Sequence, residues 1–526
     1  MAAPPTTTDP ADRRRAAVGL TISIVVLLVL AAAMIGTVDH RGTAPITRPG
    51  GGRASGGGTS SAGGTSDTTT TIAAVERGGA TTPFTAAPGA VAGGRATRRQ
   101  WRVAATAAGM PPAASTESTG ASATPGRLTA PHALAADVAH GWYVLSARLR
   151  GTDGGGRVQL TVDGTRVGEW STTTPWLVRS APVWIDGPST EVGLAPVGPS
   201  SGNGALVDWL ALTPGDAVYA TAGNAVIDRH GRPVELRGVN RESLEATSTG
   251  WYLNDHDADM MRDWGTGIVR LQLSQHFWLS SMCTYDPAYA GRVDAEVARI
   301  TSRGMVALLD LHWSTRGRSC GVHDQQEMAD DLSVQFWSQV ASRYRGNPLV
   351  AFDLYNEPHD IDDATWRDGG VVGAWYGIGG WHAAGMQQLY DAVRATGATN
   401  LVFVSGRNWA ADLAPGLAYP LDGFGIVYAA HVYCQGCGGL PPDLDEGVLR
   451  AAATWPVVVT EFGDNASSGT FQAEAIAWAE SHGLGWIAFA WAAGRPDTYA
   501  LLESWDRPDP NAAGVPVRDA LLEARR

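Results

Sequence analysis

Eight short apolar segments alternate with helix-compatible stretches in the C-terminal part of the chain, and this alternation sets the strongest limit on the fold. The apolar segments are residues 234–236, 267–273, 305–311, 350–354, 401–404, 425–429, 456–459 and 485–489, and the helix-compatible stretches include 288–302, 331–345, 383–396 and 471–481. Strands that alternate with helices form parallel sheets, so we predict an α/β fold, a (β/α)8 TIM barrel over residues 220–526. The alternative is a doubly wound open sheet, but no glycine-rich phosphate loop follows the first strand.

Polar and aromatic side chains gather at or near the carboxyl ends of these strands, where a parallel barrel forms its active site. They are Arg270, His312, Asn356, Glu357, His431, Tyr433, Glu461 and Trp491. Glu357 and Glu461 each follow an apolar run closely, in the segments LYNEP (354–358) and VTEFG (459–463). Two carboxylates brought together in this way cleave glycosidic bonds. Either glutamate alone could instead cap a helix or form half of an ion pair.

The N-terminus determines the expected compartment. Residues 16–38 carry no charge and are long enough to span a membrane as a helix, and three arginines end the preceding segment 1–15. The positive-inside rule then keeps residues 1–15 in the cytoplasm and the catalytic domain outside the cell. We therefore expect a single-pass protein of the cell membrane. The alternative is a signal peptide cleaved near residues 31–33, which would release a secreted protein.

The four cysteines would lie in an oxidising space in either case. They show no zinc-binding pattern, because no second CxxC and no paired histidines accompany Cys434 and Cys437. We expect one disulfide between Cys434 and Cys437 and another between Cys283 and Cys320, although sequence alone leaves the connectivity open.

Two regions of different composition precede the barrel. Residues 39–125 are rich in Gly, Ser, Thr, Ala and Pro, and are expected to form a disordered linker. Residues 126–216 contain many short alternating strands and a hairpin turn at Asp163-Gly164, and predict a small β-sandwich. The order of these strands resembles jelly-roll carbohydrate-binding modules of families 6 and 35. The resemblance makes Trp142, Trp170 and Trp176 candidates for binding sugar, and a purely structural sandwich is the alternative.

Overall charge and tryptophan content narrow the range of partners. The formal net charge of −13 argues against nucleic acid, which needs a basic surface. The chain has 20 tryptophans, which serve either in core packing or as flat surfaces for sugar rings. Five lie near strand ends or in the following loops, where some could line sugar subsites: Trp251, Trp278, Trp313, Trp375 and Trp409.

Taken as an ordered set, the residues at the strand ends resemble glycoside hydrolase family 5 of clan A. The set comprises Arg270, His312, Asn356-Glu357-Pro358, His431, Tyr433, Glu461 and Trp491, and residues 223–228 and 236–240 resemble the start of the family's domain. The resemblance covers essentially all of residues 220–526. It implies that Glu357 is the acid/base, Glu461 the nucleophile and Asn356 the donor to the sugar 2-hydroxyl. It also implies that His312 and His431 orient groups in the site and that Trp491 is a platform beneath the sugar.

The charges of these residues fit the two roles. Arg270 and Tyr433 would keep Glu461 ionised, and the negative charge of Glu461 would raise the pKa of Glu357 so that it begins protonated. The hypothesis is a retaining hydrolase that acts by double displacement through a covalent glycosyl-enzyme.

The family resemblance implies a β-linked polysaccharide as substrate, with β-1,4-glucan first. The alternatives are a β-mannanase, an exo-acting β-glycosidase on oligosaccharides, or a catalytically silent glycan-binding protein at the cell surface. We expect no metal and no cofactor, a membrane contact through the N-terminal helix, and a monomer.

Overall fold

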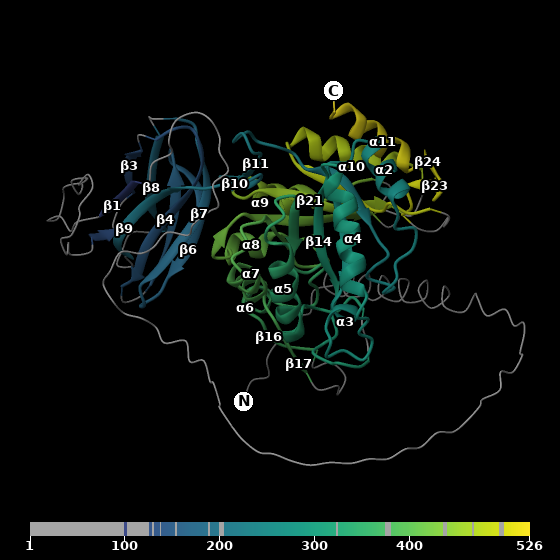
Figure 1. Cartoon of the computed structure of the whole chain (residues 1–526), viewed down its shortest axis with the longest axis horizontal. Helices are drawn as coiled ribbons and strands as arrows, with labels where there is room; N and C mark the ends of the chain where they lie inside the picture. Colours follow the sequence, from purple (N-terminus) through teal and green to yellow (C-terminus); the bar gives the residue numbers. More distant parts are fainter. Residues whose placement is uncertain are drawn as a thin grey trace, which may run out of the picture. The chain divides into compact units, whose positions relative to one another are not determined.

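The fold is seen in a computed structural model of the chain (Figure 1). The described residues are 99–102, 126–128, 131–136, 138–152, 155–187, 190–198, 205–321, 324–373, 380–434, 439–464, 468–493 and 499–525. They belong to one compact unit, Thr85–Arg526. The expected cytoplasmic tail, membrane helix and most of the linker lie outside these residues. Among the helices that can be described, none has the length and apolar character needed to cross a membrane.

Eight parallel strands close into the expected barrel. In barrel order they are β12 (Arg237–Arg241), β13 (Ile268–Ser274), β14 (Val306–Trp313), β15 (Val350–Asp353), β18 (Val402–Ser405), β20 (Ile426–Cys434), β21 (Val457–Asp464) and β22 (Gly485–Ala488). Strand β22 pairs with β12 and closes the ring. The prediction of a TIM-type barrel is therefore confirmed.

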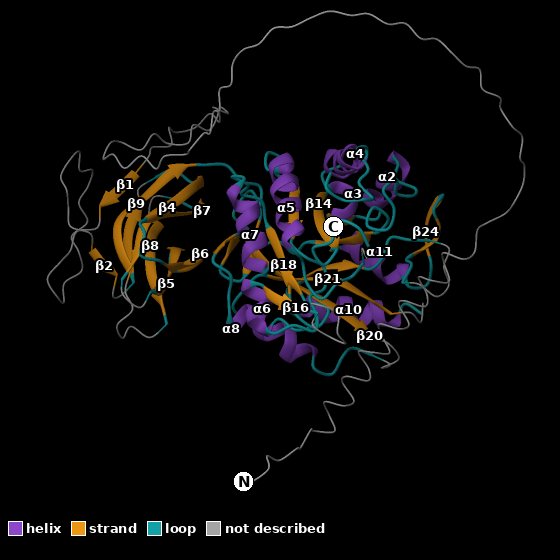
Figure 2. Ribbon diagram, turned by 90° about the horizontal axis from the view of Figure 1, so that it is seen from below, coloured by secondary structure: helices purple, strands orange, loops and turns teal. Residues whose placement is uncertain are grey.

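Helices surround the barrel strands (Figure 2). They are α2 (Asp255–Asp263), α3 (Gln275–Trp278), α4 (Tyr289–Ser302), α5 (Asp331–Tyr344), α6 (Asp363–Asp368), α7 (Met386–Ala395), α8 (Ala414–Ala418), α9 (Arg450–Ala452), α10 (Thr470–Ser481) and α11 (Gly514–Glu523), with a π-helical turn at Asp445–Leu449. Short strand pairs complete the domain: β10 (Ala220–Ala222) with β11 (Ala225–Ile227), β16 (Gly370–Val372) with β17 (Trp381–Ala383), and β23 (Leu502–Ser504) with β24 (Arg507–Pro510).

The two faces of the strands explain how the barrel positions polar groups. One apolar cluster includes Ile268, Leu308 and Ala351, which lie on neighbouring strands. The next residue along each of these strands points to the other face and packs in the large cluster shared with the helices. Side chains two residues apart along a strand share a face. The next positions on that face are Arg270, Asp310 and Asp353, which are buried. Apolar packing thus gives way to charged groups toward the carboxyl ends of the strands.

The first strand lies later in the chain than expected. The apolar residues 234–236 precede the strand, which runs from Arg237 to Arg241. A Cβ atom on Gly238 would lie 1.7 Å from the carbonyl oxygen of Ile268, so close pairing with β13 requires glycine there. Because this strand carries Gly238 and Asn240, it lacks the apolar run that predicts a buried strand.

Residues 126–214 form a second core within the described unit. One sheet has β2 (Gly126–Leu128), β4 (Gly141–Gly151), β7 (Leu177–Ile185) and β9 (Ala205–Pro214), together with β1 (Arg99–Arg102); the other has β3 (His132–Ala136), β5 (Gly156–Val162), β6 (Thr165–Thr172) and β8 (Thr190–Val197). Both sheets are antiparallel and contribute to one apolar cluster. The turn between β5 and β6 has φ of +48° at Asp163 and +76° at Gly164, as a tight hairpin requires.

The barrel domain contributes a strand to the second of these sheets. Strand β19 (Gly423–Phe424) pairs antiparallel with β6. Beside this pairing, the guanidinium of Arg157 lies 2.8 Å from the carboxylate of Asp422, and that of Arg166 lies 3.5 Å from the ring centre of Trp455. Backbone hydrogen bonds, an ion pair and a cation–π contact therefore join the two cores.

Candidate active site

Arg270 on β13 is the central cation of the site and is fully buried. Its Nε donates to Oδ2 of Asp353 at 2.8 Å, and its Nη2 lies 3.1 Å from Oδ1 of Asp310. Its Nη2 also donates to Oδ1 of Asn356 at 2.8 Å, and its Nη1 donates to Oε1 of Glu461. Burial acts to lower the pKa of Arg270, but the charges of the three carboxylates act to raise it by more. The pKa of Arg270 therefore lies above its ordinary value. Arg270 is therefore a permanent positive charge beneath the site.

Asp310 and Asp353 stand side by side in the register of β14 and β15. Burial raises the pKa of each carboxyl to about 7, although the charge of Arg270 acts to lower it. Among the described residues, the ion-pair partners of Arg270 are Asp310, Asp353 and Glu461.

Glu461 lies in the carboxyl-terminal half of β21 and is held from two sides. In addition to the contact with Arg270, it accepts a 2.6 Å hydrogen bond at Oε2 from the hydroxyl of Tyr433 on β20. Burial, followed by the nearby charge of Glu461, raises the pKa of Tyr433 well above its usual range. Tyr433 therefore keeps its proton and donates it in the hydrogen bond. Both carboxylate oxygens of Glu461 therefore accept a hydrogen bond, one from Arg270 and one from Tyr433.

Glu357 faces Glu461 across His431. The Nδ1 atom of His431 lies 2.9 Å from Oε1 of Glu357 and 3.6 Å from Oε2 of Glu461. One carboxylate oxygen from each glutamate and a ring nitrogen of His431 all lie within 4.8 Å of one another. Burial raises the pKa of Glu357, while His312, His359 and Arg270 act to lower it. The pKa of Glu357 therefore lies in the expected direction, but through burial rather than through the charge of Glu461.

His312 extends the buried polar network from β14. Its Nδ1 lies 2.7 Å from Oδ2 of Asp310, and its Nε2 lies 3.5 Å from Nδ2 of Asn356. Burial lowers the pKa of His312 to about 4 and that of His431 to about 3. Both imidazoles are therefore neutral near pH 7, so they act as hydrogen-bonding groups rather than as cations.

Trp491 does not match the platform expected from the sequence. Its ring has 0% exposure, packs edge-on against Trp264 at 4.8 Å, and donates from Nε1 to Oδ1 of Asp257 at 2.8 Å. A ring without an exposed face has no surface on which a sugar could stack. Phe489, two residues earlier, is only partly buried and lies 6.1 Å from the ring of Tyr433.

The remaining tryptophan candidates differ in their surroundings. Trp278 is 7% exposed and donates to Gln339, whereas Trp409 stacks on His359 with ring centres 4.7 Å apart. Trp251 and Trp313 are partly exposed, and Trp375 lies outside the described residues. Among the described candidates, Trp409 is the one that stacks on a residue close to Glu357 in the chain, His359.

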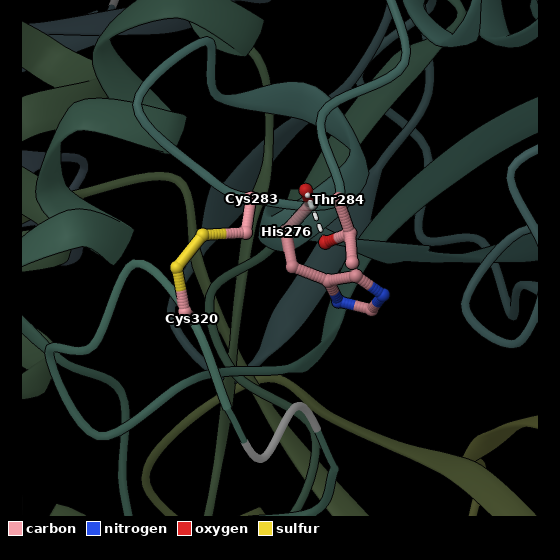
Figure 3. The surroundings of a disulfide bond; sticks show 4 residues. All are labelled: His276, Cys283, Thr284 and Cys320. Atoms are coloured by element: carbon pink, nitrogen blue, oxygen red, sulfur yellow. Dashed lines mark hydrogen bonds between the residues drawn. A yellow bond between two sulfur atoms is a disulfide. The ribbon is translucent and has the colours of Figure 1, made fainter.

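The disulfide between Cys283 and Cys320 is present, as expected (Figure 3). It joins the loop after β13 to the loop after β14, and the amide of Cys283 also donates to the carbonyl of Ser319 at 2.9 Å. Beside it, the hydroxyl of Thr284 donates to the carbonyl of His276 at 3.1 Å. Cys437 lies outside the described residues, so the pairing of Cys434 with Cys437 stays a prediction.

The site has donors that a metal could use. Among the described residues, Glu357, His431 and Glu461 have ligand atoms close enough to share one ion. They are the same groups that a carboxylate-pair reaction needs free, and that chemistry runs without a metal. The expectation of no cofactor therefore stays a prediction.

A parallel barrel with two facing carboxylates at the ends of β15 and β21 defines the class of carboxylate-pair glycoside hydrolases. Residues 227–495 match the family model described as cellulase, glycosyl hydrolase family 5, and this match covers more than half of the chain. The chain belongs to glycosyl hydrolase family 5.

Individual relatives are distant. Endoglucanase E-5 of Thermobifida fusca is 23% identical over 261 residues, which are 47% of this chain and 48% of that protein. The cellulase CelDZ1 of a Thermoanaerobacterium species is 22% identical over 287 residues, 50% of this chain and 67% of that protein. The chain thus spans about half the length of the first of these relatives. Among solved structures, the β-glucanase SdGluc5_26A of Saccharophagus degradans has a TM-score of 0.48 and 23% identity, covering 60% of this chain and 95% of its own.

Proposed function

We propose that the protein is a retaining glycoside hydrolase that cleaves a β-linked glucan, with Glu461 as nucleophile and Glu357 as acid/base. The observation that carries this proposal is the separation of the two carboxylates, whose closest ligand oxygens lie within 4.8 Å. Retaining enzymes place their carboxyl groups about 5 Å apart, whereas inverting enzymes need roughly 6.5–9.5 Å to admit a water molecule between them. The spacing therefore favours direct attack by a carboxylate.

The proposed reaction has two steps. An oxygen of Glu461 attacks the anomeric carbon, the bond to the leaving oxygen breaks, and Glu357 gives its proton to that oxygen. Water then attacks the same carbon, Glu357 takes a proton from it, and Glu461 is released as a carboxylate. Because burial raises the pKa of Glu357, this residue can hold the proton that the first step needs. Arg270 and Tyr433 stabilise the negative charge that returns to Glu461 in the second step.

The substrate proposed is a β-1,4-glucan chain, as for the endoglucanases to which this chain is similar. Aromatic rings on the loops that follow the barrel strands support an extended sugar chain as ligand. Tyr252, after β12, is 52% exposed and stacks on Trp505, after β22, with ring centres 4.8 Å apart and planes 4° from parallel. Such flat, fixed faces are suited to stacking on sugar rings.

A sugar-release assay tests this function. The protein is expected to release reducing sugar from carboxymethylcellulose, and mannan, xyloglucan and laminarin serve as competing substrates. Preferential release of sugar from mannan would identify mannan, and not glucan, as the substrate. Release of single sugars from chain ends would indicate an exo-acting enzyme. If the protein binds these glycans but releases no sugar from any of them, it is a catalytically silent glycan-binding protein instead. The Glu357→Gln variant is the matched control for contaminating activity.

We also propose an accessory role for the β-sandwich and a membrane anchor at residues 16–38. Trp176 supports sugar binding by the sandwich, because it is partly exposed and lies near the guanidinium groups of Arg148 and Arg150, at 5.1 and 5.6 Å. Trp170 is 5% exposed in the core, and Trp142 donates to the carbonyl of Arg229, so both have structural partners. Loss of cellulose binding in Trp176→Ala would support this role, and unchanged binding would contradict it. Fractionation of cells expressing the full chain tests the anchor against secretion.

A further inference from the structure

The loop after β14 lies along the segment that carries Glu357. The amide of Gln326 donates to the hydroxyl of Tyr355 at 3.1 Å, and that hydroxyl donates to the carbonyl of Gln326 at 2.7 Å. Beyond Glu357, the amide of His359 donates to the carbonyl of Glu327 at 3.0 Å. Residues 325–327 are therefore fixed to the chain on both sides of Glu357.

Gln325 uses both ends of its side-chain amide within this contact. Its Nε2 donates to the main-chain carbonyl of Glu357 at 2.9 Å, and its Oε1 accepts from Nδ2 of Asn356 at 3.0 Å. Asn356 is 2% exposed, and its Oδ1 accepts from Arg270 at 2.8 Å. The two amides thus form a chain of hydrogen bonds from the carbonyl of Glu357 to the guanidinium of Arg270.

The ends of this chain determine the orientation of both amides. A carbonyl can only accept, so Gln325 must turn Nε2 toward Glu357 and Oε1 toward Asn356. Arg270 can only donate, so Asn356 must turn Oδ1 toward Arg270 and Nδ2 toward Gln325. The two requirements agree. The second hydrogen of Asn356 Nδ2 faces Nε2 of His312 only at 3.5 Å, a long contact that a sugar hydroxyl could replace.

We propose that Gln325 is a positioning residue that holds the amide of Asn356 with its NH₂ group toward the 2-hydroxyl of the bound sugar and holds the main chain of Glu357. The inference rests on the proposed function, because it needs a sugar in the site. Gln325 itself touches the two residues and not the reacting atoms. Its removal therefore affects turnover through Asn356, which is what the following experiment measures.

The experiment compares Gln325→Leu with the wild-type protein on two activated substrates. One is dinitrophenyl β-cellobioside, and the other is the same glycoside without the 2-hydroxyl on the sugar that is cleaved. We expect Gln325→Leu to lose about 10- to 100-fold in kcat/KM on the first, the loss typical of a buried amide that loses one hydrogen-bond partner. The loss should be several-fold smaller on the 2-deoxy substrate. Gln325→Leu should cost little further in an Asn356→Ala background, because the residue through which Gln325 acts is then already absent.

Two further variants separate positioning from folding. Gln339→Leu removes an amide that bonds to Trp278 outside the site, and should leave both substrates unaffected. Gln325→Glu keeps the acceptor for Asn356 but loses the donor to Glu357, and its negative charge should move the basic limb of the pH profile upward. Thermal unfolding checks that each variant is folded.

An equal loss on both substrates, or no loss, would overturn the role of Gln325 while leaving the proposed function in place. A wild-type protein without activity on either glycoside would overturn the proposed function and this inference with it.

Discussion

The Nδ1 atom of His431 forms a 2.9 Å hydrogen bond with Oε1 of Glu357. Because burial lowers the pKa of His431 to about 3, the ring is neutral at ordinary pH. A neutral ring can donate to the ionised carboxylate or accept from the protonated acid, depending on its tautomer. Within the described part of the chain, Nε2 of His431 has no hydrogen-bond partner that would select one tautomer. The contact can therefore serve Glu357 in both of its protonation states.

Replacing His431 with phenylalanine should lower kcat by roughly 10- to 100-fold, because Glu357 loses this hydrogen bond in both steps. The pH dependence of kcat/KM above about pH 4 should be the same as in the wild type, because His431 does not titrate there. A pH–rate profile of the variant measures both effects. Disappearance of an inflection between pH 5 and 7 would show that His431 is charged in the free protein, against this account.

The pH dependence should report Glu357 directly. Its pKa is raised by burial, and the first step needs the protonated acid, so activity should fall as pH rises through that pKa. In Glu357→Gln this basic limb should vanish, and turnover of substrates with poor leaving groups should fall about 10²- to 10⁴-fold. Activated aryl glycosides, which need little protonation, should lose much less in the first step. Equal losses for good and poor leaving groups would rule out Glu357 as the acid.

Glu461→Ala should abolish turnover, because no carboxylate remains to attack the anomeric carbon. Azide should restore part of the activity with an activated glycoside by taking the place of the nucleophile. Glu327→Ala, which removes a glutamate paired with Arg316 instead, is the control and should retain turnover. Full activity in Glu461→Ala would remove Glu461 from the role of nucleophile.

Asp353 should make stability depend on pH. Burial raises its pKa to about 7, so the folded protein binds a proton there that the unfolded chain has lost above about pH 4. The stability that this proton provides is lost as pH rises from about 4 to 7. In Asp353→Asn the melting temperature should therefore fall less over that range than in the wild type. Asp259→Asn, in which the replaced carboxyl has a lowered pKa, should not show this change.

The disulfide between Cys283 and Cys320 should contribute measurably to stability. It closes a loop with a sequence separation of 37 residues, for which loss of chain entropy predicts about 3–4 kcal/mol. The double substitution Cys283→Ser with Cys320→Ser should lower the free energy of unfolding by roughly that amount, measured in denaturant. An unchanged midpoint of unfolding would show that these loops are held by other contacts.

The strand ends and the pair of glutamates could be predicted because each depends on a local pattern, an apolar run followed by a polar residue. The first strand could not, since Gly238 and Asn240 interrupt the apolar run that would mark it. The burial of Trp491 depends on Asp257 and Trp264, which are distant in sequence. Gln325 was missed for a similar reason: an amide in a loop has no pattern that reveals its partners. Such residues become recognisable only when the fold brings their partners together.

The stereochemistry of the first product tests the central claim most directly. If Glu461 attacks the anomeric carbon and water displaces it, the configuration is inverted twice, and the sugar is released with the β-configuration of the substrate. Proton NMR of a cello-oligosaccharide digest, recorded before the anomers equilibrate, measures this outcome. The account predicts that the β-anomer appears first and the α-anomer grows in later. Initial release of the α-anomer would contradict the double displacement.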